Sequence, residues 1–325
     1  MKILVTGGAG YIGSHTCKAL AHAGFEPIVF DNLSTGHSEF VKWGPLIQGD
    51  LLDRSRLMQV LREEEIAGVI HFAAKSSVGE SQISPHLYYQ NNIVGSLNLL
   101  ECMREVGVKS MIFSSTCAVY GNAVQTPMRE DHPQAPTSVY GWSKLMIERM
   151  LFDYAQAYGV QSIILRYFNA SGADPEGELG ESHHPETHLI PLCLDVALGR
   201  RRHLEIFGED YSTPDGTCIR DYIHVSDLAS AHVLALRRLL ERGESQVYNL
   251  GSGQGHSVRD VIASVERVTQ RQLKVVSSPR RAGDSAILLA ASEGVQKDLG
   301  WKIKYPHLED HIRHAWSWHL RSHEE

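Results

Sequence analysis

The hydrophobic and polar positions of the first half alternate between two patterns. Short continuous apolar runs, typical of strands buried on both faces, are separated by stretches in which apolar residues recur every three or four positions. The expected strands are Lys2–Thr6, Pro27–Phe30, Gly68–Phe72, Ser110–Ser114 and Gln161–Arg166, and the expected helices are Gly13–Ala23, Ser55–Glu64, Pro85–Val106 and Tyr140–Tyr158. This order predicts an α/β fold with a doubly wound parallel sheet covered by helices on both faces.

The second half is less regular. It opens with a segment rich in Gly, Pro, Glu and His, Gly172–His188, which we expect to form a long connecting or substrate loop. The later elements are expected at Leu189–Gly199, Val225–Arg238, Ser257–Arg271 and His307–His323 as helices and at Leu204–Phe207 as a strand. We therefore predict a first domain at 1–172 and a smaller C-terminal α/β substrate-binding lobe at 173–325, with segments near 217–240 packing back on the first domain.

Composition narrows the function classes. The chain has 325 residues, 42% of them hydrophobic, with a formal net charge of -7, so a basic footprint for nucleic acid or an anionic membrane is not expected. No apolar run has membrane-spanning length, and the N-terminus does not read as a signal peptide. Cysteines are scattered singly, at Cys17, Cys102, Cys117, Cys193 and Cys218. Free thiols and a cytoplasmic location are the resulting predictions.

The glycines of TGGAGYIG lie between the first strand and its helix. Gly7, Gly10 and Gly13 permit a sharp turn and close approach of the backbone to a pyrophosphate, while the helix directs its first N–H groups at the anion. In this strand–turn–helix context the motif indicates a Rossmann-type dinucleotide site. Asp31 ends the second strand, where a carboxylate binds the adenosine ribose and repels a 2′-phosphate, which favours NAD over NADP. The plain alternative is an aspartate in a turn.

Asp50 follows the third strand pattern, in the sequence GDLL. Its carboxylate suits either the adenine amino group or the N-cap of the helix that follows, and the two roles are compatible.

A pair of reactive side chains stands on the expected helix Tyr140–Tyr158. Tyr140 and Lys144 are four residues apart and share one helix face. A free phenol has a pKa of about 10, and a neighbouring ammonium together with a cationic nicotinamide ring brings it into working range. Upstream, Ser114 and Thr116 end a strand, where ligands of open α/β sheets bind, so Thr116 can bridge a substrate oxygen and Tyr140. Taken alone, Tyr-x-x-x-Lys is usually a solvated helix face.

With these motifs the chain resembles the extended short-chain dehydrogenase/reductase family, and closely its UDP-glucose (UDP-galactose) 4-epimerases. The resemblance covers nearly the whole chain. It rests on TGGAGYIGSHT, DNLSTGH, HFAAKSSVGES, YYQNN, FSSTCAVYG, YGWSK, LRYFNASGA, HLIP, GRR, IFGEDY, GTCIRDYIHV, YNLGSG and RRAGD. Related dehydratases carry an Asp–Glu pair after the strand-end Thr, whereas this chain has Cys117 and Ala118.

The resemblance implies an enzyme that uses bound NAD to epimerise C4 of a UDP-hexose through a 4-keto sugar, with Tyr140, Thr116 and Lys144 as the catalytic set. The implied NAD contacts are Gly7, Gly10, Tyr11, Ile12, Gly13, Asp31, Asn32, Asp50, Leu51, Phe72, Ala73, Ala74, Asn91, Ser114, Tyr140, Lys144 and Tyr167. The implied UDP-sugar contacts are Thr116, Tyr140, Asn169, His188, Leu189, Phe207, Arg220, Arg281 and Asp284. It also implies a homodimer through helices within 85–106 and 140–158.

At two positions the chain departs from the family pattern, so the sequence does not fix which sugar the enzyme acts on. Ser76 stands where many epimerases place a Lys, with Lys75 one position earlier, and Leu288 stands where side-chain size governs tolerance at C2. The alternatives are therefore a C4 epimerase of a UDP-pentose, a UDP-uronate or a UDP-N-acetylhexosamine. A non-catalytic NAD-sensing protein is a further alternative, although such proteins commonly lose the Tyr–Lys pair.

The 18 histidines raise the question of a metal. His183, His184 and His188 fall in HHPETH, and His307, His311 and His314 have helical spacing. Without HExxH or a nearby Cys pair we predict no metal site, and expect a polar loop and a half-exposed terminal helix.

Overall fold

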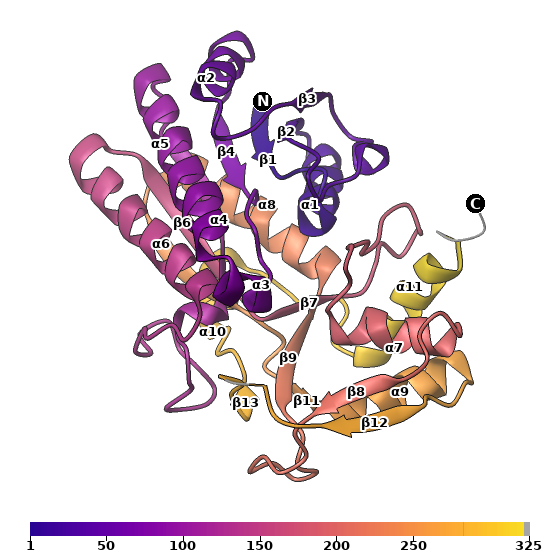
Figure 1. Ribbon diagram of the computed structural model, residues 1–325. Coiled ribbons are helices and arrows are strands. Elements are labelled where there is room, and N and C mark those ends of the chain that lie inside the picture. The colour runs from indigo at the N-terminus through magenta and orange to yellow at the C-terminus, as the bar shows by residue number, and fades with distance from the viewer. Residues whose placement is uncertain (282, 322–325) are drawn as a thin grey trace.

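The computed structural model describes residues 1–281 and 283–321. A large α/β unit contains the N-terminus, and a smaller unit lies beside it and contains most of the second half (Figure 1). Ser322 and His323, the expected end of the last helix, lie outside the described residues.

Seven strands form the central sheet, in the order β10-β6-β5-β4-β1-β2-β3, and every neighbouring pair is parallel. They are β1 (Lys2–Thr6), β2 (Glu26–Asp31), β3 (Leu46–Gln48), β4 (Gly68–His71), β5 (Ser110–Thr116), β6 (Gln161–Tyr167) and β10 (Gln246–Leu250). The strand order changes direction between β1 and β4, the switch point where such sheets bind ligands. The predicted doubly wound parallel sheet is confirmed.

Side chains of β1 show how both faces of the sheet are covered, because successive residues point to opposite sides. Ile3 and Val5 are buried in the cluster that includes α1 and α8, whereas Leu4 is buried in the cluster that includes α2, α5 and α6. These helices are α1 (Tyr11–His22), α2 (Arg54–Glu63), α5 (Gly95–Val106), α6 (Val139–Tyr158) and α8 (Val225–Arg242). The two clusters form the core that holds the strand ends in place.

The expected helix Pro85–Val106 is helical throughout but is not a single α-helix. After the short α3 (Val78–Ile83) it consists of α4 (Pro85–Tyr88), the π-helical segment η2 (Tyr89–Val94) and α5. The wide π turns place Asn92 inward, fully buried, where its Nδ2 donates to the Ser143 hydroxyl at 3.0 Å and its Oδ1 accepts from the Lys75 N–H at 2.8 Å. Helical spacing of apolar residues does not reveal such a local change of period.

Within residues 1–281 and 283–321, the smaller unit is built from short strands and three helices. One sheet contains β7 (Asn169–Ser171), β9 (Ile219–His224), β11 (Gly255–Ser257) and β13 (Ile287–Leu288), and β8 (Leu204–Phe207) pairs with β12 (Val275–Ser278). The helices α7 (Leu189–Ala197), α9 (Val258–Thr269) and α11 (Leu308–Arg321) supply its apolar core. Only β8 was expected among these strands. The shortest of the others, such as the two-residue β13, carry too few positions for a periodic pattern.

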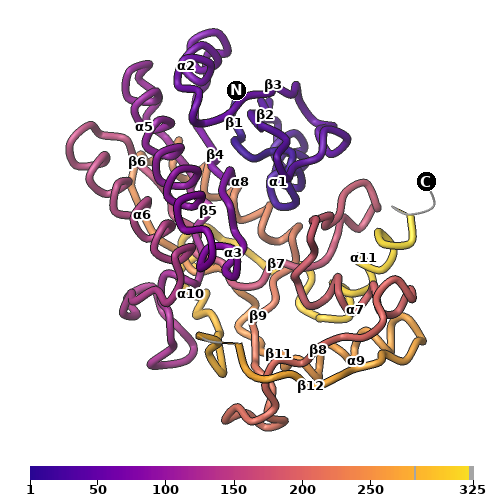
Figure 2. The backbone as a smooth tube through the Cα atoms, in the orientation of Figure 1, coloured from indigo at the N-terminus to yellow at the C-terminus, as the bar shows by residue number. Residues whose placement is uncertain are grey.

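Three later segments return to the large unit. Helix α8 packs on α1, β10 adds an edge strand beside β6, and α10 (Glu293–Leu299) packs on β10 (Figures 1 and 2). The two units are therefore not simply consecutive in the chain. The predicted division at residues 172 and 173 stays a prediction.

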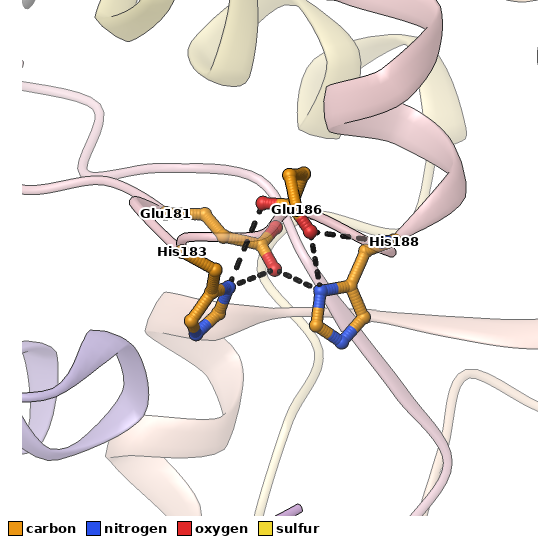
Figure 3. Close-up of side chains that lie close together, drawn as sticks. All are labelled: Glu181, His183, Glu186 and His188. Carbon is orange, nitrogen blue, oxygen red and sulfur yellow. Dashed lines mark hydrogen bonds and ion pairs between the residues drawn. The ribbon is translucent and has the colours of Figure 1, made fainter. Parts of the chain in front are cut away.

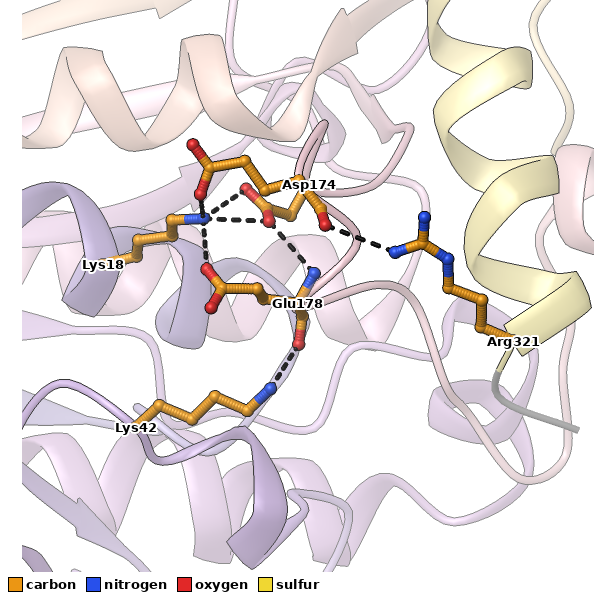
Figure 4. Close-up of polar contacts among 6 residues, drawn as sticks. Lys18, Lys42, Asp174, Glu178 and Arg321 are labelled. Carbon is orange, nitrogen blue, oxygen red and sulfur yellow. Dashed lines mark hydrogen bonds and ion pairs between the residues drawn. The ribbon is translucent and has the colours of Figure 1, made fainter. Parts of the chain in front are cut away.

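The loop after β7 is held on α1 by a cluster of charges (Figure 4). The buried ammonium of Lys18 contacts the carboxylates of Asp174 at 2.9 Å and of Glu176 and Glu178 at 2.6 Å. Arg321 of α11 donates to the Glu176 carbonyl at 3.3 Å. The three acidic groups thus share one lysine of the large unit, which fixes the start of the loop that leads to α7.

One of the terminal histidines, His311, differs from the expectation of a half-exposed helix, whereas His314 is half-buried. His311 of α11 is buried, and its ring nitrogens lie 2.8 Å from the Ser171 hydroxyl and 2.8 Å from the Tyr305 carbonyl. His314 Nδ1 lies 3.0 Å from His224 Nε2. Burial lowers the pKa of His311 to about 4, so its neutral ring serves as a packed hydrogen-bonding group.

Candidate functional site

The glycine turn after β1 has the geometry of a phosphate-binding loop. Gly7 has φ +75°, and a Cβ there would lie 2.6 Å from the Ala73 nitrogen. A Cβ on Gly13 would lie 2.2 Å from the Gly7 carbonyl, whereas one on Gly10 would meet only that carbonyl, at 3.4 Å. Gly10 is also the N-cap of α1. Gly7 and Gly13 therefore allow close packing of the turn, and Gly10 leaves room in front of the N-terminus of α1.

Acidic groups at the ends of β2 and β3 flank this turn. Asp31 accepts from the N–H groups of Ala9 at 3.0 Å and Leu33 at 2.9 Å, which fixes its carboxylate against the glycine turn. Asp50 accepts from the Asn32 amide at 2.7 Å. The N-cap of α2 is Asp53 and not Asp50, because α2 begins at Arg54, four residues after Asp50. The Asp50 carboxylate instead orients the Asn32 side chain beside the loop that follows β2.

The other expected cofactor positions lie beside the glycine turn or pack into the core. The Phe72 and Ala73 N–H groups both donate to the Thr6 carbonyl, so the end of β4 lies against the turn after β1, followed by half-buried Ala74. Ile12 and Leu51 pack into the two core clusters.

The remaining two positions make specific polar contacts. The Asn91 amide donates to Asn92 at 3.0 Å. The Tyr11 hydroxyl donates to the Gly172 carbonyl at 2.6 Å, so this side chain joins α1 to the loop after β7.

The end of β5 brings the predicted catalytic hydroxyls together. Thr116 is the last residue of β5, and its hydroxyl accepts from the Ala118 N–H at 3.1 Å. Tyr140 stands in the first turn of α6 and is half-buried. Burial raises the pKa of the Tyr140 phenol well above its ordinary value, the nearby Tyr167 phenol raises it further, and a hydrogen bond with Thr116 lowers it in part. At neutral pH the phenol is therefore protonated in the free protein.

Lys144 lies one helical turn after Tyr140. Its ammonium donates to the Ser114 carbonyl at 2.8 Å and lies 4.9 Å from the centre of the Phe113 ring. Burial lowers the pKa of Lys144 to about 7, and the Glu148 carboxylate opposes that shift. The Ser114 hydroxyl in turn hydrogen-bonds Tyr167. The end of β5 and the start of α6 thus place the Tyr140 phenol, the Thr116 hydroxyl and the Lys144 amine at one edge of the sheet. Because the pKa of Lys144 is about 7, its charge can change near neutral pH.

A buried ion pair behind this set was missed by the sequence analysis. Glu148 and Arg166 are 1% and 2% exposed, and the Arg166 Nη2 lies 2.6 Å from the carboxylate. Glu148 also accepts from the Ser115 hydroxyl, and Arg166 donates to the Tyr120 hydroxyl at 3.0 Å. The spacing of Glu148 four residues after Lys144 was the only available indication, since a Glu on a helix is normally solvated.

The predicted substrate residues of the smaller unit form two contacting pairs. The Arg281 guanidinium lies 3.8 Å from the centre of the Phe207 ring. Arg220 of β9 donates to the Ser285 carbonyl at 2.8 Å and lies 3.4 Å from Asp284. Phe207 at the end of β8 thus lies beside Arg281, and Arg220 of β9 lies beside Asp284. Such a set can bind a diphosphate and hydroxyl groups.

The other predicted substrate positions lie around the start of α7 and β7. Asn169 begins β7, His188 is the N-cap residue of α7, and Leu189 is its first residue and half-buried. Leu288 lies in β13 opposite Arg220 and packs against the cluster that contains Val119 and Phe168.

Lys75 and Ser76 follow the end of β4. The Lys75 backbone is fixed by two hydrogen bonds with Asn92, and its side chain is half-buried, whereas Ser76 is exposed. Cys117 is not a reactive thiol, because burial raises its pKa to about 11. All five cysteines are unpaired, as predicted.

Comparisons with known proteins find similar proteins over nearly the whole length of this chain. Residues 3–251 match the NAD dependent epimerase/dehydratase family. The UDP-glucose 4-epimerase of Rhizobium leguminosarum bv. trifolii is 50% identical over 98% of this chain and 98% of the relative. In the described part of the chain, no helix is long and apolar enough to cross a membrane.

Two solved structures illustrate the match in three dimensions. The Brucella ovis UDP-glucose 4-epimerase in complex with NAD superposes with a TM-score of 0.95, at 50% identity over 97% of both chains. The Stenotrophomonas maltophila enzyme with bound NAD and formylated UDP-arabinopyranose gives 0.96, at 40% identity over 100% of both. The chain therefore belongs to the NAD dependent epimerase/dehydratase family.

Proposed function

We propose that this enzyme interconverts UDP-glucose and UDP-galactose by NAD-dependent epimerisation at C4. The observation that carries the proposal is that Tyr140 hydrogen-bonds Thr116 and Lys144 donates to the Ser114 carbonyl, which gathers the three side chains at the end of β5. The relatives of matching length, which are UDP-glucose 4-epimerases, support the choice of reaction.

The residues present fit NAD. Gly10 leaves the N-terminus of α1 open to a pyrophosphate, and Asp31 stands beside the turn with a carboxylate suited to ribose hydroxyls. When bound there, NAD+ would accept the C4 hydrogen as hydride and return it. Lys144 would bind the nicotinamide ribose, and Ser114 and Tyr167 would line the same edge.

Proton transfer falls to Tyr140 and Thr116. Tyr140 would take the C4 hydroxyl proton as the 4-keto sugar forms and return it after the sugar presents its other face. Thr116 would bridge the C4 oxygen and the phenol. Because the phenol is protonated in the free protein at neutral pH, its activation requires the positive charges of Lys144 and the oxidised nicotinamide.

Binding of UDP would fall to the smaller unit, through the diphosphate contacts of Arg220 and Arg281, the ribose contact of Asp284 and packing on Phe207. Asn169, His188 and Leu189 would line the remaining side. Product analysis on a panel of UDP-hexoses, UDP-pentoses, UDP-uronates and UDP-N-acetylhexosamines tests the proposal. Rapid interconversion of UDP-glucose and UDP-galactose is expected, whereas preference for another class would replace the proposed substrate.

We expect the purified protein to carry NAD(H) without any being added. The cofactor is regenerated in every turnover, so the reaction never requires its release, and Asp31 disfavours a 2′-phosphate. Denaturing the protein and assaying the supernatant measures the bound nucleotide. A clean apoprotein that binds NADP better than NAD would contradict the role of Asp31.

We infer that the size of the Leu288 side chain allows both plain and N-acetylated sugars to react, at different rates. This side chain is half-buried, lies opposite Arg220 and is smaller than an aromatic residue, which leaves room for a C2 N-acetyl group. A pocket discriminates by about 1–3 kcal/mol for a methylene-sized change. We therefore expect UDP-galactose to be the best substrate and UDP-N-acetylgalactosamine a weaker one.

Leu288→Tyr should suppress the N-acetylated reaction more than the plain one, as measured by kcat/KM for both sugars. Equal losses of both activities, or no N-acetyl activity in the parent, would show that Leu288 does not set this preference.

We also propose a homodimer through α5 and α6. Leu97 on α5 and Trp142, Met146 and Phe152 on α6 are exposed apolar side chains on neighbouring outer helices (Figure 1). Such a face favours association. Sedimentation equilibrium is expected to give the mass of a dimer, and a monomer at micromolar concentration would contradict the proposal. The cytoplasmic location stays a prediction.

A further inference from the structure

The loop before α7 brings four potential metal ligands together. These are Glu181, His183, Glu186 and His188, and one nitrogen or oxygen atom from each lies within 4.8 Å of the others. Figure 3 shows both imidazole rings presenting a nitrogen to the two carboxylates. From sequence, His183, His184 and His188 were not expected to bind a metal. In the fold, His184 is exposed, and the two glutamates take its place.

The spacing of these atoms is close to that of a tetrahedral site. His183 Nδ1 lies 3.2 Å from Glu181 Oε1 and 3.6 Å from Glu186 Oε2, and His188 Nδ1 lies 2.9 Å from Glu181 Oε1. Zinc bonds of about 2.0–2.1 Å place neighbouring ligand atoms of a tetrahedron about 3.4 Å apart. Small side-chain movements would therefore suffice to surround an ion.

Neighbouring groups fix the direction of the ligands. Glu186 Oε1 accepts from the backbone N–H groups of Thr187 at 2.7 Å and His188 at 2.8 Å, which leaves Oε2 facing His183. Tyr11 holds the His183 ring edge-on, with the ring centres 6.3 Å apart. Hydrogen bonds to a carboxylate, like those of Glu186, are typical of ligands held for a metal.

The His183 Nδ1 atom gives an independent indication. It is buried and makes no hydrogen bond of acceptable geometry, although the Glu181 and Glu186 carboxylates lie 3.2 and 3.6 Å away. A nitrogen directed between two carboxylates suits a cation that all three groups share better than a single N–H donor.

We propose that Glu181, His183, Glu186 and His188 bind one divalent transition-metal ion of the zinc type. Imidazole and carboxylate are ligands that zinc accepts. The two carboxylates balance its charge once each imidazole has released the proton from its binding nitrogen. Four protein ligands close the coordination shell, so the ion is structural. It fixes the loop between Tyr11 at the start of α1 and His188 at the start of α7, and it shares His188 with the proposed UDP-sugar contacts.

Zinc binding by the untagged, full-length protein tests this proposal. After treatment with a chelator and dialysis, the protein is titrated with Zn²⁺ in competition with a chromophoric chelator, and its melting temperature is measured with and without Zn²⁺. The same titration is made on His183→Ala and on Glu186→Gln, which keeps the side-chain size. His184→Ala is the matched control, because His184 is exposed and lies next to the cluster.

We expect the parent and His184→Ala to bind one Zn²⁺ per chain with a rise in melting temperature. His183→Ala and Glu186→Gln should bind at least about tenfold more weakly, while circular dichroism and bound NAD stay as in the parent. Cobalt bound in place of zinc should show the visible absorption of a tetrahedral site. The proposal is overturned if the parent binds Zn²⁺ only weakly, or if both variants retain the affinity of the parent. Protons, rather than a metal, would then hold the cluster together.

Discussion

Tyr140→Phe is expected to lower turnover by about a hundredfold or more, the usual effect of removing a general acid or base. The hydroxyl is the only group that this variant loses, so the ring should still fill the first turn of α6. Binding of the nucleotide should change little, because the proposed UDP contacts are Arg220, Arg281 and Asp284 of the smaller unit. Turnover of UDP-galactose and the Kd of UDP measure the two effects.

The control for this variant is Tyr158→Phe. Tyr158 ends the same helix and is exposed, so loss of its hydroxyl should leave turnover unchanged. Near-normal activity of Tyr140→Phe would remove Tyr140 from its proposed role.

Glu148→Ala is expected to destabilise the fold by about 3–5 kcal/mol, because it leaves the Arg166 guanidinium buried without its counterion. Arg166 is 2% exposed and its Nη2 lies 2.6 Å from Glu148, so water cannot replace the carboxylate without rearrangement. The Ser115 hydroxyl would also lose its acceptor. Urea unfolding of the parent and the variant measures the change in free energy of unfolding.

Two further variants separate this role from a general effect of removing charge. Glu63→Ala removes an exposed carboxylate of α2 and should change stability by less than about 1 kcal/mol. Glu148→Gln keeps the shape and gives a folded protein for study if Glu148→Ala does not fold. Since Glu148 raises the pKa of Lys144, the Lys144 pKa should fall further below its ordinary value in Glu148→Gln, which NMR titration of the side chain can follow. A Glu148→Ala protein as stable as the parent would contradict the importance of the ion pair.

Most of the large unit could be predicted from sequence because its strands are continuous apolar runs separated by amphipathic helices. Gly7, Gly10 and Gly13 are local in sequence, and Tyr140 and Lys144 share one helix turn, so spacing alone brings each set together. The smaller unit could not be predicted in detail. Its strand β13, for example, has two residues and owes its place to pairing with β9.

Other features depend on contacts between distant segments. Glu148 and Arg166 come from α6 and β6 and become a buried pair only when these elements pack. The wide turn at Asn92 depends on partners at Lys75 and Ser143. From sequence alone such polar residues are expected to be exposed to solvent, because the partners that allow their burial lie in other elements of the chain.

The proposed epimerisation is tested most directly by following the hydrogen on C4. UDP-galactose carrying deuterium at C4 is incubated with the purified protein without added NAD, and the UDP-glucose formed is analysed by NMR and mass spectrometry. Tyr140 is proposed to move only the hydroxyl proton, while the hydrogen on carbon is taken up and returned within the site. We therefore expect the deuterium to be retained at C4 of UDP-glucose. Product with solvent hydrogen at C4, or the absence of UDP-glucose, would contradict the proposed mechanism.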